Sequence, residues 1–423
     1  MRKPQIGDEV LIILENKKQE QGILLESHEA GIVLLKLSSG YNIGIKKRDI
    51  KNIKILKKAK EEKETEESIK MKGKPIVEIV ITGGTISSKL DPKTGGVKDL
   101  TKPEEFFSTY PEIFEVVDVR IKKPFTKWSE NMDSGDWIKL ANQVAKSLND
   151  NNVKAVIVTH GTDFLHYTAS ALSFMLHDLN KPVILTYSQR STDRGSSDAR
   201  LNLLCSAEAA LSDIAEVMLV GHASSNDDFC YAFKGTKVRK MHTSRRDAFR
   251  PINCKPIAKI CPNKIETLGE YKKRNKNIVK ADAVFEDKVA LIKFYPGQSP
   301  DILDFYEKKK YKGLIIEMSG LGHVINDGKN NWIPKLKQFI DKGMIICAAP
   351  QTLYGRLDPY VYESARRILE TGVIYLEDIL PETALVKLGY VLGHKLSKEK
   401  IKEMMLKNLA GEFNKRLGEE FLV

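Results

Sequence analysis

Short apolar runs alternate with polar turns over residues 1–56. The runs are rich in isoleucine, leucine and valine, and polar residues follow each of them. Short strands at this spacing are typical of a small antiparallel barrel. The predicted strands are Glu9–Leu14, Gln21–Leu25, Ile32–Leu37 and Ile43–Ile45. We therefore predict that residues 1–56 form a small SH3-like all-β barrel.

A highly charged segment follows this domain. Between Lys57 and Lys74 the chain has seven lysines and five glutamates and almost nothing apolar. A segment of this composition cannot bury a core, and it is typical of a solvated tether or an exposed, charged helix. We predict a domain boundary here and assign residues 57–74 to a linker.

From Pro75 onward the apolar runs are almost continuous, and helical periodicity follows them. Strands that are apolar on both faces and alternate with helices predict a parallel α/β sheet, in which ligands bind beyond the carboxyl ends of the strands. The predicted strands are Ile76–Ile81, Ala155–Val158, Val183–Leu185, Glu216–Val220, Val289–Phe294, Gly313–Glu317 and Met344–Ala348. An irregular stretch, Asn263–Lys288, divides them between two α/β domains, which we place at residues 75–285 and 286–423.

Composition excludes several classes of protein. No apolar run approaches the roughly 18 residues that a membrane-spanning helix requires, and the first residues lack the apolar core of a signal peptide. The five cysteines lie far apart without a CxxC pair, so the sequence indicates neither a disulfide framework nor a zinc site. We expect a cytoplasmic protein with no membrane contact, no metal and no cofactor of its own.

The chain is basic. Its 68 Lys+Arg against 56 Asp+Glu give a formal net charge of +12. A cationic surface of this size attracts polyanions such as RNA. Lysine is frequent throughout the chain, so a general habit of composition explains the charge equally well, and both explanations stay open.

The first motif that carries chemistry is TGGTIS, Thr82–Ser87, directly after an apolar strand. Gly83 and Gly84 allow a sharp turn and a close approach of the backbone to a ligand, and they leave the Thr85 hydroxyl at the edge of the sheet. A hydroxyl in this place can act as a nucleophile. A phosphate-binding turn or a plain turn explains the motif as well.

The second motif is VTHGTDF, Val158–Phe164, again at the end of a strand. It presents Thr162 and Asp163 side by side at the same edge. Thr and Asp are also favoured N-caps, and Leu165–Leu179 is predicted to be a helix, so these two residues could merely cap it.

The third motif is GTKVRKMHTSRRDAF, Gly235–Phe249, which we interpret as a basic loop. Lysine is usually an exposed surface charge. Beside an aspartate in a partly desolvated cleft, however, Lys240 could exchange a proton with a threonine hydroxyl and so activate it.

These three motifs, in this order, resemble the L-asparaginase and glutaminase family, whose intracellular members share a KxHTSRxDAF motif that Lys240–Phe249 matches. The resemblance extends from about Pro75 to near the C-terminus and implies the two-domain fold of that family. The other segments that support it are SENM (Ser129–Met132), RSTDRGSSDARLNL (Arg190–Leu203) and SGLGHV (Ser319–Val324).

The resemblance implies catalytic roles by position. Thr85 corresponds to the nucleophile of a first triad, and Thr162, Asp163 and Lys240 correspond to a second one. The family also places a tyrosine on the loop after TGGT. The segment Ile86–Leu100 contains none, which leaves the general base of the first triad unassigned.

Substrate contacts follow in the same way. Ser129 and Glu130 occupy the place where the family holds the α-amino and carboxylate groups of the substrate. We expect backbone N–H groups around Gly84 and Gly161 to hold the oxyanion of the reaction.

An asparaginase-like core with an N-terminal β-domain and a tether resembles, more narrowly, the D subunits of archaeal glutamyl-tRNA(Gln) amidotransferases. That resemblance implies a subunit that releases ammonia from glutamine or asparagine. It implies an E subunit that uses ATP and magnesium to convert Glu-tRNA(Gln) to Gln-tRNA(Gln). It further implies a homodimeric core within a heterotetramer of two D and two E subunits, which meets tRNA(Gln) through the complex.

Two alternatives remain. A stand-alone asparaginase would use the same chemistry, with the extra domain serving dimer contacts or solubility. A non-catalytic scaffold would keep the fold and dock tRNA on its basic face, but the intact set of Thr85, Thr162, Asp163 and Lys240 argues against this.

Overall fold

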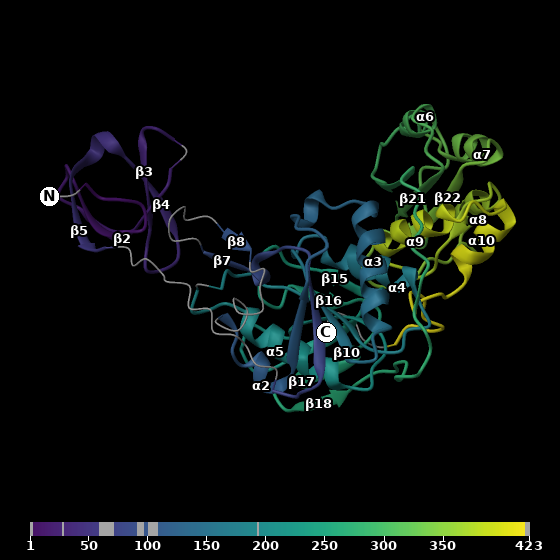
Figure 1. The fold of residues 1–423 in the computed structure, drawn as a ribbon. Coiled ribbons are helices and arrows are strands. Elements are labelled where there is room, and N and C mark those ends of the chain that lie inside the picture. The colour runs from purple at the N-terminus through teal and green to yellow at the C-terminus, as the bar shows by residue number, and fades with distance from the viewer. Residues whose placement is uncertain are drawn as a thin grey trace.

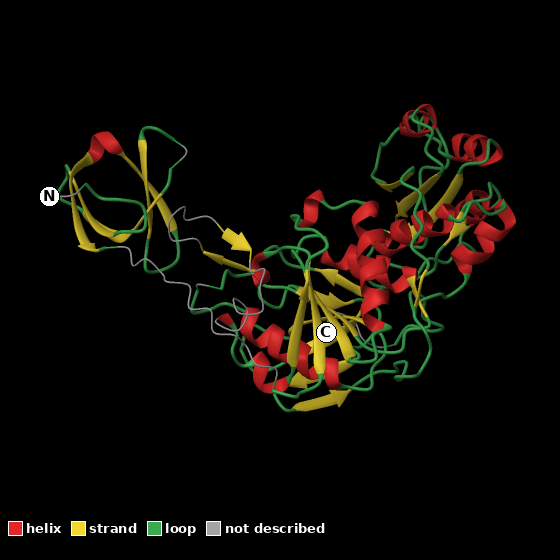
Figure 2. Cartoon of the chain, in the orientation of Figure 1, coloured by secondary structure: helices red, strands yellow, loops and turns green. Residues whose placement is uncertain are grey.

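Three larger sheets organise the part of the chain that the structure describes (Figure 1, Figure 2). The computed structural model describes residues 3–27, 29–58, 72–90, 97–99, 109–192 and 194–418. An N-terminal β-sheet stands at one side of the molecule, a large mixed sheet occupies the middle, and a smaller parallel sheet lies at the other side. The predicted combination of an all-β domain with an α/β core is confirmed.

The N-terminal sheet is antiparallel, with strand order β4-β3-β2-β1-β5. Its small core contains the fully buried side chains of Val10, Ile12 and Leu35. The elements are β1 (Glu9–Leu14), β2 (Gln19–Leu25), β3 (Ile32–Lys36), β4 (Asn42–Lys46), a 3₁₀ turn (Lys47–Asp49) and β5 (Ile50–Lys57). Strand β5 was not predicted, because lysines interrupt its apolar positions. Residues 59–71 of the proposed linker lie outside the described residues.

The hairpin formed by β3 and β4 contacts Arg194 of the α/β core. The guanidinium of Arg194 lies over the ring of Tyr41, 5.6 Å from its centroid. Nη2 of Arg194 also donates to the carbonyl of Gly40 at 3.4 Å. The contact joins the turn between β3 and β4 to the segment that precedes helix α5 (Ala199–Leu211).

The central sheet has eight strands in the order β18-β17-β14-β13-β12-β10-β6-β9. Its strands are β6 (Ile76–Ile81), β9 (Asp118–Lys122), β10 (Val153–Thr159), β12 (Val183–Thr186), β13 (Val217–His222), β14 (Cys230–Lys234), β17 (Ala258–Cys261) and β18 (Lys264–Thr267). The strands from β9 to β13 are parallel, as predicted, but β14, β17 and β18 extend the sheet in antiparallel fashion. The predicted parallel α/β core is therefore confirmed, and the antiparallel strands are an extension of it that was not predicted.

Helices cover both faces of the central sheet, which explains why its strands are apolar throughout. Val80 and Val156 face the core beneath α3 and α4, whereas the neighbouring Ile79 and Ile157 face the core beneath α5. The helices are α2 (Ile113–Val116), α3 (Ser134–Leu148), α4 (Leu165–Met175) and α5 (Ala199–Leu211). The paired short strands are β7 (Ser88–Leu90) with β8 (Val97–Asp99), β11 (Leu176–His177) with β19 (Lys280–Ala281), and β15 (Val238–Lys240) with β16 (Phe249–Pro251).

Two details differ from the predictions for this domain. Helix α4 ends at Met175, because the chain turns extended at Leu176 to pair with β19. The stretch Asn263–Lys288 is mostly irregular, as expected, but it also contributes β18 and β19.

The C-terminal domain is built on a parallel sheet of order β20-β21-β22-β23. Its elements are β20 (Val289–Lys293), α6 (Ile302–Lys308), β21 (Gly313–Met318), α7 (Ile333–Asp341), β22 (Ile345–Pro350), α8 (Glu363–Leu369), β23 (Ile374–Tyr375), α9 (Pro381–Gly393) and α10 (Lys398–Leu406). Helix α9 is almost completely buried between this sheet and α4. In the described part of the chain, no helix combines the length and the apolar character needed to cross a membrane.

The segment that joins the two α/β domains is seated on α9. A Cβ added to Gly389 would overlap the ring of Phe285, and one added to Gly393 would lie 2.7 Å from the backbone nitrogen of Phe285. The other side of the Phe285 ring packs edge-on against Trp137 of α3, with the ring centroids 5.4 Å apart. Glycine at position 389 therefore serves close packing rather than backbone conformation.

This packing predicts the effect of Gly389→Ala. Replacing an interior helical glycine by alanine ordinarily stabilises a protein by roughly 1 kcal/mol. Here the added methyl overfills the junction, and we expect the free energy of unfolding to fall by about 1–3 kcal/mol in urea denaturation. In a Phe285→Ala background the same change should become neutral or stabilising. A gain in stability in the otherwise wild-type chain would contradict this account of the junction.

Candidate active site

Parallel register brings the first two motifs to one level at the carboxyl edge of the central sheet. Ile81, the last residue of β6, pairs with Thr159, the last residue of β10. Beyond them, both the backbone N–H and the hydroxyl of Thr82 donate to the carbonyl of Thr159, at 3.2 and 2.9 Å. The strand ends are thus fixed side by side before either glycine turn begins.

The glycines of the two motifs touch. Gly83 and Gly84 have φ of 122° and 87°, which favours glycine at both positions. A Cβ on Gly84 would lie 2.6 Å from the backbone nitrogen of Gly161, and one on Gly161 would lie 3.1 Å from Cβ and Oγ of Ser129. TGGT, THGTD and SENM therefore meet at one point, as a shared binding site requires. The backbones of Gly84 and Gly161 form the floor there.

Lys240 connects the third motif to this point. Its Nζ lies 2.8 Å from Oγ1 of Thr162 and 2.6 Å from Oδ1 of Asp163. Only 9% of the Lys240 side chain is exposed, whereas 62% of the Asp163 side chain is. A largely buried ammonium between a hydroxyl and a carboxylate can exchange a proton with the hydroxyl while the carboxylate stabilises its charge.

The structure excludes one interpretation of Thr162 and Asp163. The N-cap of α4 is Phe164, and no side chain caps the helix. Capping is therefore not their role. The third motif was wrongly interpreted as a loop at Lys240 itself, because Val238–Lys240 forms β15, which pairs with β16.

The remaining predicted residues lie around the same point. Thr85, directly after Gly84, is half-buried and begins a 3₁₀ turn, Thr85–Ser87. Ser129 is buried, whereas Glu130 is exposed, with its Oε2 3.5 Å from Oγ of Ser129. DPKTGGV, the segment that stands where the resemblance places a tyrosine, lies outside the described residues except for Val97.

A buried histidine, His160, supports the second motif, although it was not among the predicted site residues. Nδ1 of His160 lies 2.7 Å from the carbonyl of Gly161, which can only accept, so Nδ1 carries the hydrogen. Nε2 then accepts from the hydroxyl of Thr168 at 2.9 Å, and this hydroxyl accepts from Nε1 of Trp137 at 3.0 Å. The chain of bonds fixes one neutral tautomer of His160 and holds the turn at Gly161.

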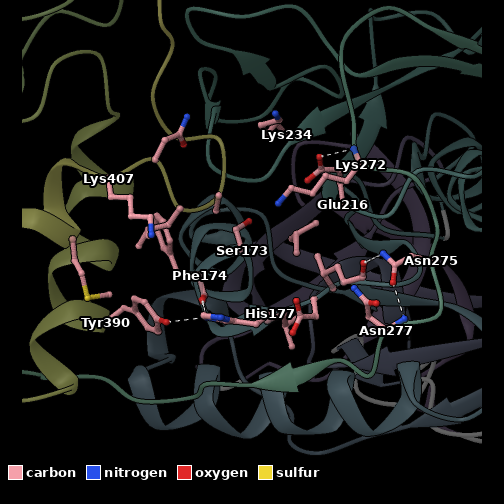
Figure 3. Close-up of a pocket in the computed structure, with 18 residues that line it drawn as sticks. Ser173, Phe174, His177, Glu216, Lys234, Lys272, Asn275, Asn277, Tyr390 and Lys407 are labelled. Carbon is pink, nitrogen blue, oxygen red and sulfur yellow. Dashed lines mark hydrogen bonds between the residues drawn. The ribbon is translucent and has the colours of Figure 1, made fainter.

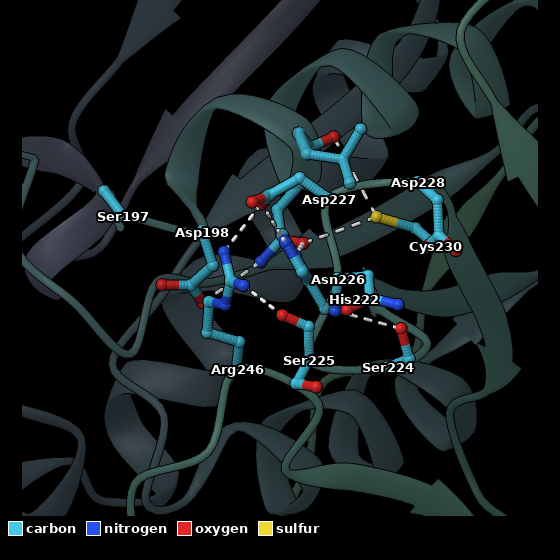
Figure 4. A network of polar contacts seen from close by, with 12 residues as sticks. Ser197, Asp198, His222, Ser224, Ser225, Asn226, Asp227, Asp228, Cys230 and Arg246 are labelled. Carbon is cyan, nitrogen blue, oxygen red and sulfur yellow. Dashed lines mark hydrogen bonds and ion pairs between the residues drawn. The ribbon is translucent and has the colours of Figure 1, made fainter. Parts of the chain in front are cut away.

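A second polar network holds the segment after Lys240 (Figure 4). Nη1 of Arg246 donates to Oδ1 of Asp227 at 2.7 Å, and the same oxygen lies 3.0 Å from Nε2 of His222. Although burial raises the pKa of Asp227, the hydrogen bonds from His222 and Arg246 outweigh it and hold the pKa below its usual value. Nδ1 of His222 in turn lies 2.6 Å from Oδ1 of Asn202 on α5. The HTSRRDAF segment is thereby fastened to the ends of β13 and α5.

A separate cavity of about 590 Å³ lies at the other end of the strands (Figure 3). It is bordered by the start of β13, the end of α4 and the segment after α10, with Lys234, Lys272 and Lys407 among its lining residues. None of the predicted site residues lines it. Among the described residues, no group of histidine, cysteine, aspartate or glutamate side chains is arranged to hold a metal ion.

Comparison with protein-family models matches all three parts of the chain. Residues 5–56 match the GatD N-terminal domain, residues 76–273 match "Asparaginase, N-terminal", and residues 288–405 match the glutaminase/asparaginase C-terminal domain. The D subunit of the glutamyl-tRNA(Gln) amidotransferase of Pyrococcus abyssi is 48% identical over 422 residues, which are 97% of this chain and 95% of that protein. The corresponding protein of Archaeoglobus fulgidus is 45% identical over 93% of this chain and 91% of its own length.

This chain belongs to the family of glutamyl-tRNA(Gln) amidotransferase D subunits. Solved structures place the fold of this family member among the asparaginases. The thermostable L-asparaginase from Thermococcus kodakarensis matches with a TM-score of 0.73 and 27% identity, over 81% of this chain and all of that one. L-asparaginase I from Vibrio cholerae matches with a TM-score of 0.70 and 29% identity, over 81% of this chain and 99% of its own. The asparaginase-like fold predicted for this GatD relative is confirmed.

The buried histidines next to the site predict how stability depends on pH. Burial lowers the pKa of His160 to about 4, although its bond to Gly161 opposes the shift. Burial, followed by the charges of Arg239, Lys240 and His160, lowers the pKa of His166 to about 3. In the unfolded chain both titrate near about 6.5. As the pH falls below that value, only the unfolded state takes up protons, so stability should decrease by about 1.4 kcal/mol per pH unit and histidine.

Urea denaturation between pH 7 and pH 4.5 measures this dependence. We expect His160→Gln to make the loss of stability with falling pH shallower. Equal slopes for wild type and His160→Gln would show that His160 is not held neutral in the folded protein.

Proposed function

We propose that this chain releases ammonia from the side-chain amide of glutamine and supplies it to a partner subunit that converts Glu-tRNA(Gln) to Gln-tRNA(Gln). The observation that carries the proposal is the bridge from Lys240 to both Thr162 and Asp163. It occurs where three glycine- and serine-containing segments meet, in a chain that matches amidotransferase D subunits over almost its whole length.

The reaction is an acyl transfer in two steps. A threonine hydroxyl adds to the amide carbon, and its proton is passed to the amide nitrogen, which leaves as ammonia. Water then hydrolyses the ester, giving glutamate and restoring the hydroxyl. Amides are poor electrophiles, and positioned acid–base groups typically contribute about 100- to 10,000-fold to such a reaction.

Backbone N–H groups at Gly84 and Gly161 support the oxyanion in this mechanism. A preorganised donor of this kind contributes about 2.7–4 kcal/mol to stabilisation of the transition state. Because Gly161 approaches both Gly84 and Ser129, a substrate held by Ser129 and Glu130 would present its amide next to this floor.

Two threonines are candidate nucleophiles. Thr162 has Lys240 within hydrogen-bond distance and Asp163 beside it, which is the arrangement of a nucleophile with its base. Thr85 follows the glycine turn and corresponds to the first nucleophile of the asparaginase family. We propose that Thr85 forms the ester and that Thr162, Asp163 and Lys240 move the protons.

The partner carries the remaining chemistry. We propose that an E subunit activates Glu-tRNA(Gln) with ATP and magnesium and accepts the ammonia, and that two D and two E subunits assemble around a homodimeric D core. tRNA(Gln) would meet this chain through the complex. Consumption of ammonia by a partner in the aqueous interior of the cell agrees with the proposed cytoplasmic location.

Alanine variants of Thr85, Thr162, Asp163 and Lys240 test the mechanism in the complex with partner and Glu-tRNA(Gln). We expect each to lower ammonia release from glutamine by at least about 100-fold, because each removes a nucleophile or proton carrier. Lys337→Ala, at an exposed lysine paired with Asp341, is the matched control and should keep full activity.

Addition of free ammonium separates the two halves of the reaction. The four variants should still form Gln-tRNA(Gln) when ammonium is supplied, because the partner is intact. Near-wild-type ammonia release by all four would contradict the assignment of the site.

A stand-alone asparaginase is the second candidate, since the asparaginases from Thermococcus and Vibrio match the core of the chain. The N-terminal domain, which matches the GatD model at residues 5–56, favours the amidotransferase. Rapid hydrolysis of asparagine by the isolated chain, without tRNA or partner, would favour the asparaginase instead.

A further inference from the structure

The strand that carries Lys240 is held by the C-terminal domain. Strand β15 is only three residues long and pairs with β16 in a sheet of its own, apart from the central sheet. Antiparallel pairing of this length cannot by itself fix the position of Lys240 to the accuracy that proton transfer requires. Other contacts must hold the strand in place.

Two ion pairs cross from the strand to the C-terminal domain on either side of Val238. Nζ of Lys237 lies 2.7 Å from Oδ2 of Asp378, and Nη1 of Arg239 lies 3.3 Å from Oε2 of Glu382. The residues of the first pair are 1% and 0% exposed in their side chains, and Glu382 is 4% exposed. Charges so deeply buried hold their partners in defined positions, because separating them leaves an uncompensated charge.

Hydrogen bonds also connect Thr236, which precedes Lys237, to the C-terminal domain. The hydroxyl of Thr236 donates to the carbonyl of Ala410 at 3.2 Å. The hydroxyl of Thr383, next to Glu382 at the start of α9, donates to the carbonyl of Thr236 at 3.2 Å. Three of the four residues before Lys240 are thus bonded to the C-terminal domain.

Of these residues of the C-terminal domain, Glu382 contacts the direct neighbour of Lys240, Arg239. It faces Arg239 on β15, His166 and Tyr167 on α4, and Glu317 on β21. His166 is neutral and its Nε2 lies 3.8 Å from Oε1 of Glu382, too far for a hydrogen bond. Among the described residues, Oε1 of Glu382 has no hydrogen-bond partner. Arg239, the neighbour of Lys240, is therefore the group through which Glu382 acts.

We propose that Glu382 is a positioning residue for the reaction, which sets the place of Lys240 against Thr162 and Asp163 by holding Arg239. Asp378 assists it through Lys237. The C-terminal domain then positions the relay of Thr162, Asp163 and Lys240, which lies at the edge of the central sheet of the same chain. The proposal rests on the proposed amidohydrolase function.

Glu382→Gln tests this inference in the complex with the partner. The substitution keeps the shape of the side chain and removes its charge, so Arg239 loses its ion pair. We expect kcat for ammonia release to fall on the order of 100-fold, because small displacements of a catalytic group have effects of this size. The KM for glutamine should change less than about 3-fold, since Glu382 does not touch the substrate site. Arg239→Gln should have the same effect, and the double variant should be no worse than either single one.

Asp282→Asn is the matched control. Asp282 accepts hydrogen bonds from Tyr390 and His394 at the other end of α9, so its loss should lower the melting temperature but leave kcat of the folded protein unchanged. An unchanged kcat in Glu382→Gln, or a loss that follows only the folded fraction, would overturn the inference. Wild-type protein assayed in parallel separates the two proposals: without ammonia release by the wild type, the proposed function itself fails.

If Glu382→Gln does not fold, Thr383→Val provides the second test. It removes the hydrogen bond to the carbonyl of Thr236 and the one shared with the hydroxyl of Ser170 at 3.0 Å, and it keeps the volume of the side chain. We expect a smaller loss of kcat, about 3- to 10-fold, again at constant KM. No change in kcat for this variant would then count against the inference.

Discussion

The parallel register between β6 and β10 is the constraint on which the rest of the site depends. Because Ile81 and Thr159 are paired, β6 and β10 end at the same level of the sheet. The glycine turns that follow these two strands are in contact. A shift by one residue would turn every side chain of β6 to the opposite face of the sheet. It would also take the buried carboxylate of Glu78 away from Gln143 and Ser147 of α3, to which it is hydrogen-bonded, so the packing of the domain opposes this shift and aligns the proposed site residues.

The relay combines elements from distant parts of the chain. Thr162 and Asp163 follow a central strand, whereas Lys240 ends a short strand outside the central sheet. Burial of Lys240 limits the water around its ammonium, so the neighbouring hydroxyl and carboxylate dominate its environment. The exposed side of Asp163 leaves room for a substrate to approach.

Much of this arrangement could be predicted from the sequence. The apolar runs located most strands of the core, and the motifs located segments that meet at the edge of the sheet, because short glycine turns after buried strands are local features. The catalytic roles of Thr85, Thr162, Asp163 and Lys240 stay predictions. Strand β5 escaped because its lysines hide its alternation. The antiparallel strands of the central sheet escaped because nothing local encodes the direction of a neighbour.

The supporting residues could not be predicted for a different reason. His160, His166 and Glu382 depend on surroundings that form only in the folded chain. Thr168 joins His160 to Trp137 of α3, and Glu382 pairs with Arg239. Nothing in the sequence around them distinguishes these residues from ordinary core or surface residues. Their protonation states depend on burial, which exists only in the folded chain.

The glycine floor of the site has a consequence for how the protein can change. A Cβ on Gly84 would collide with the backbone of His160 and Gly161, and one on Gly161 would lie tightly against Ser129, so mutation at Gly84 damages this surface rather than reshaping it. Under the proposed function, a change of preference between glutamine and asparagine has to occur in the side chains around this backbone. The same floor could therefore persist unchanged while selectivity evolves above it, which separates the fixed chemistry from the adaptable recognition.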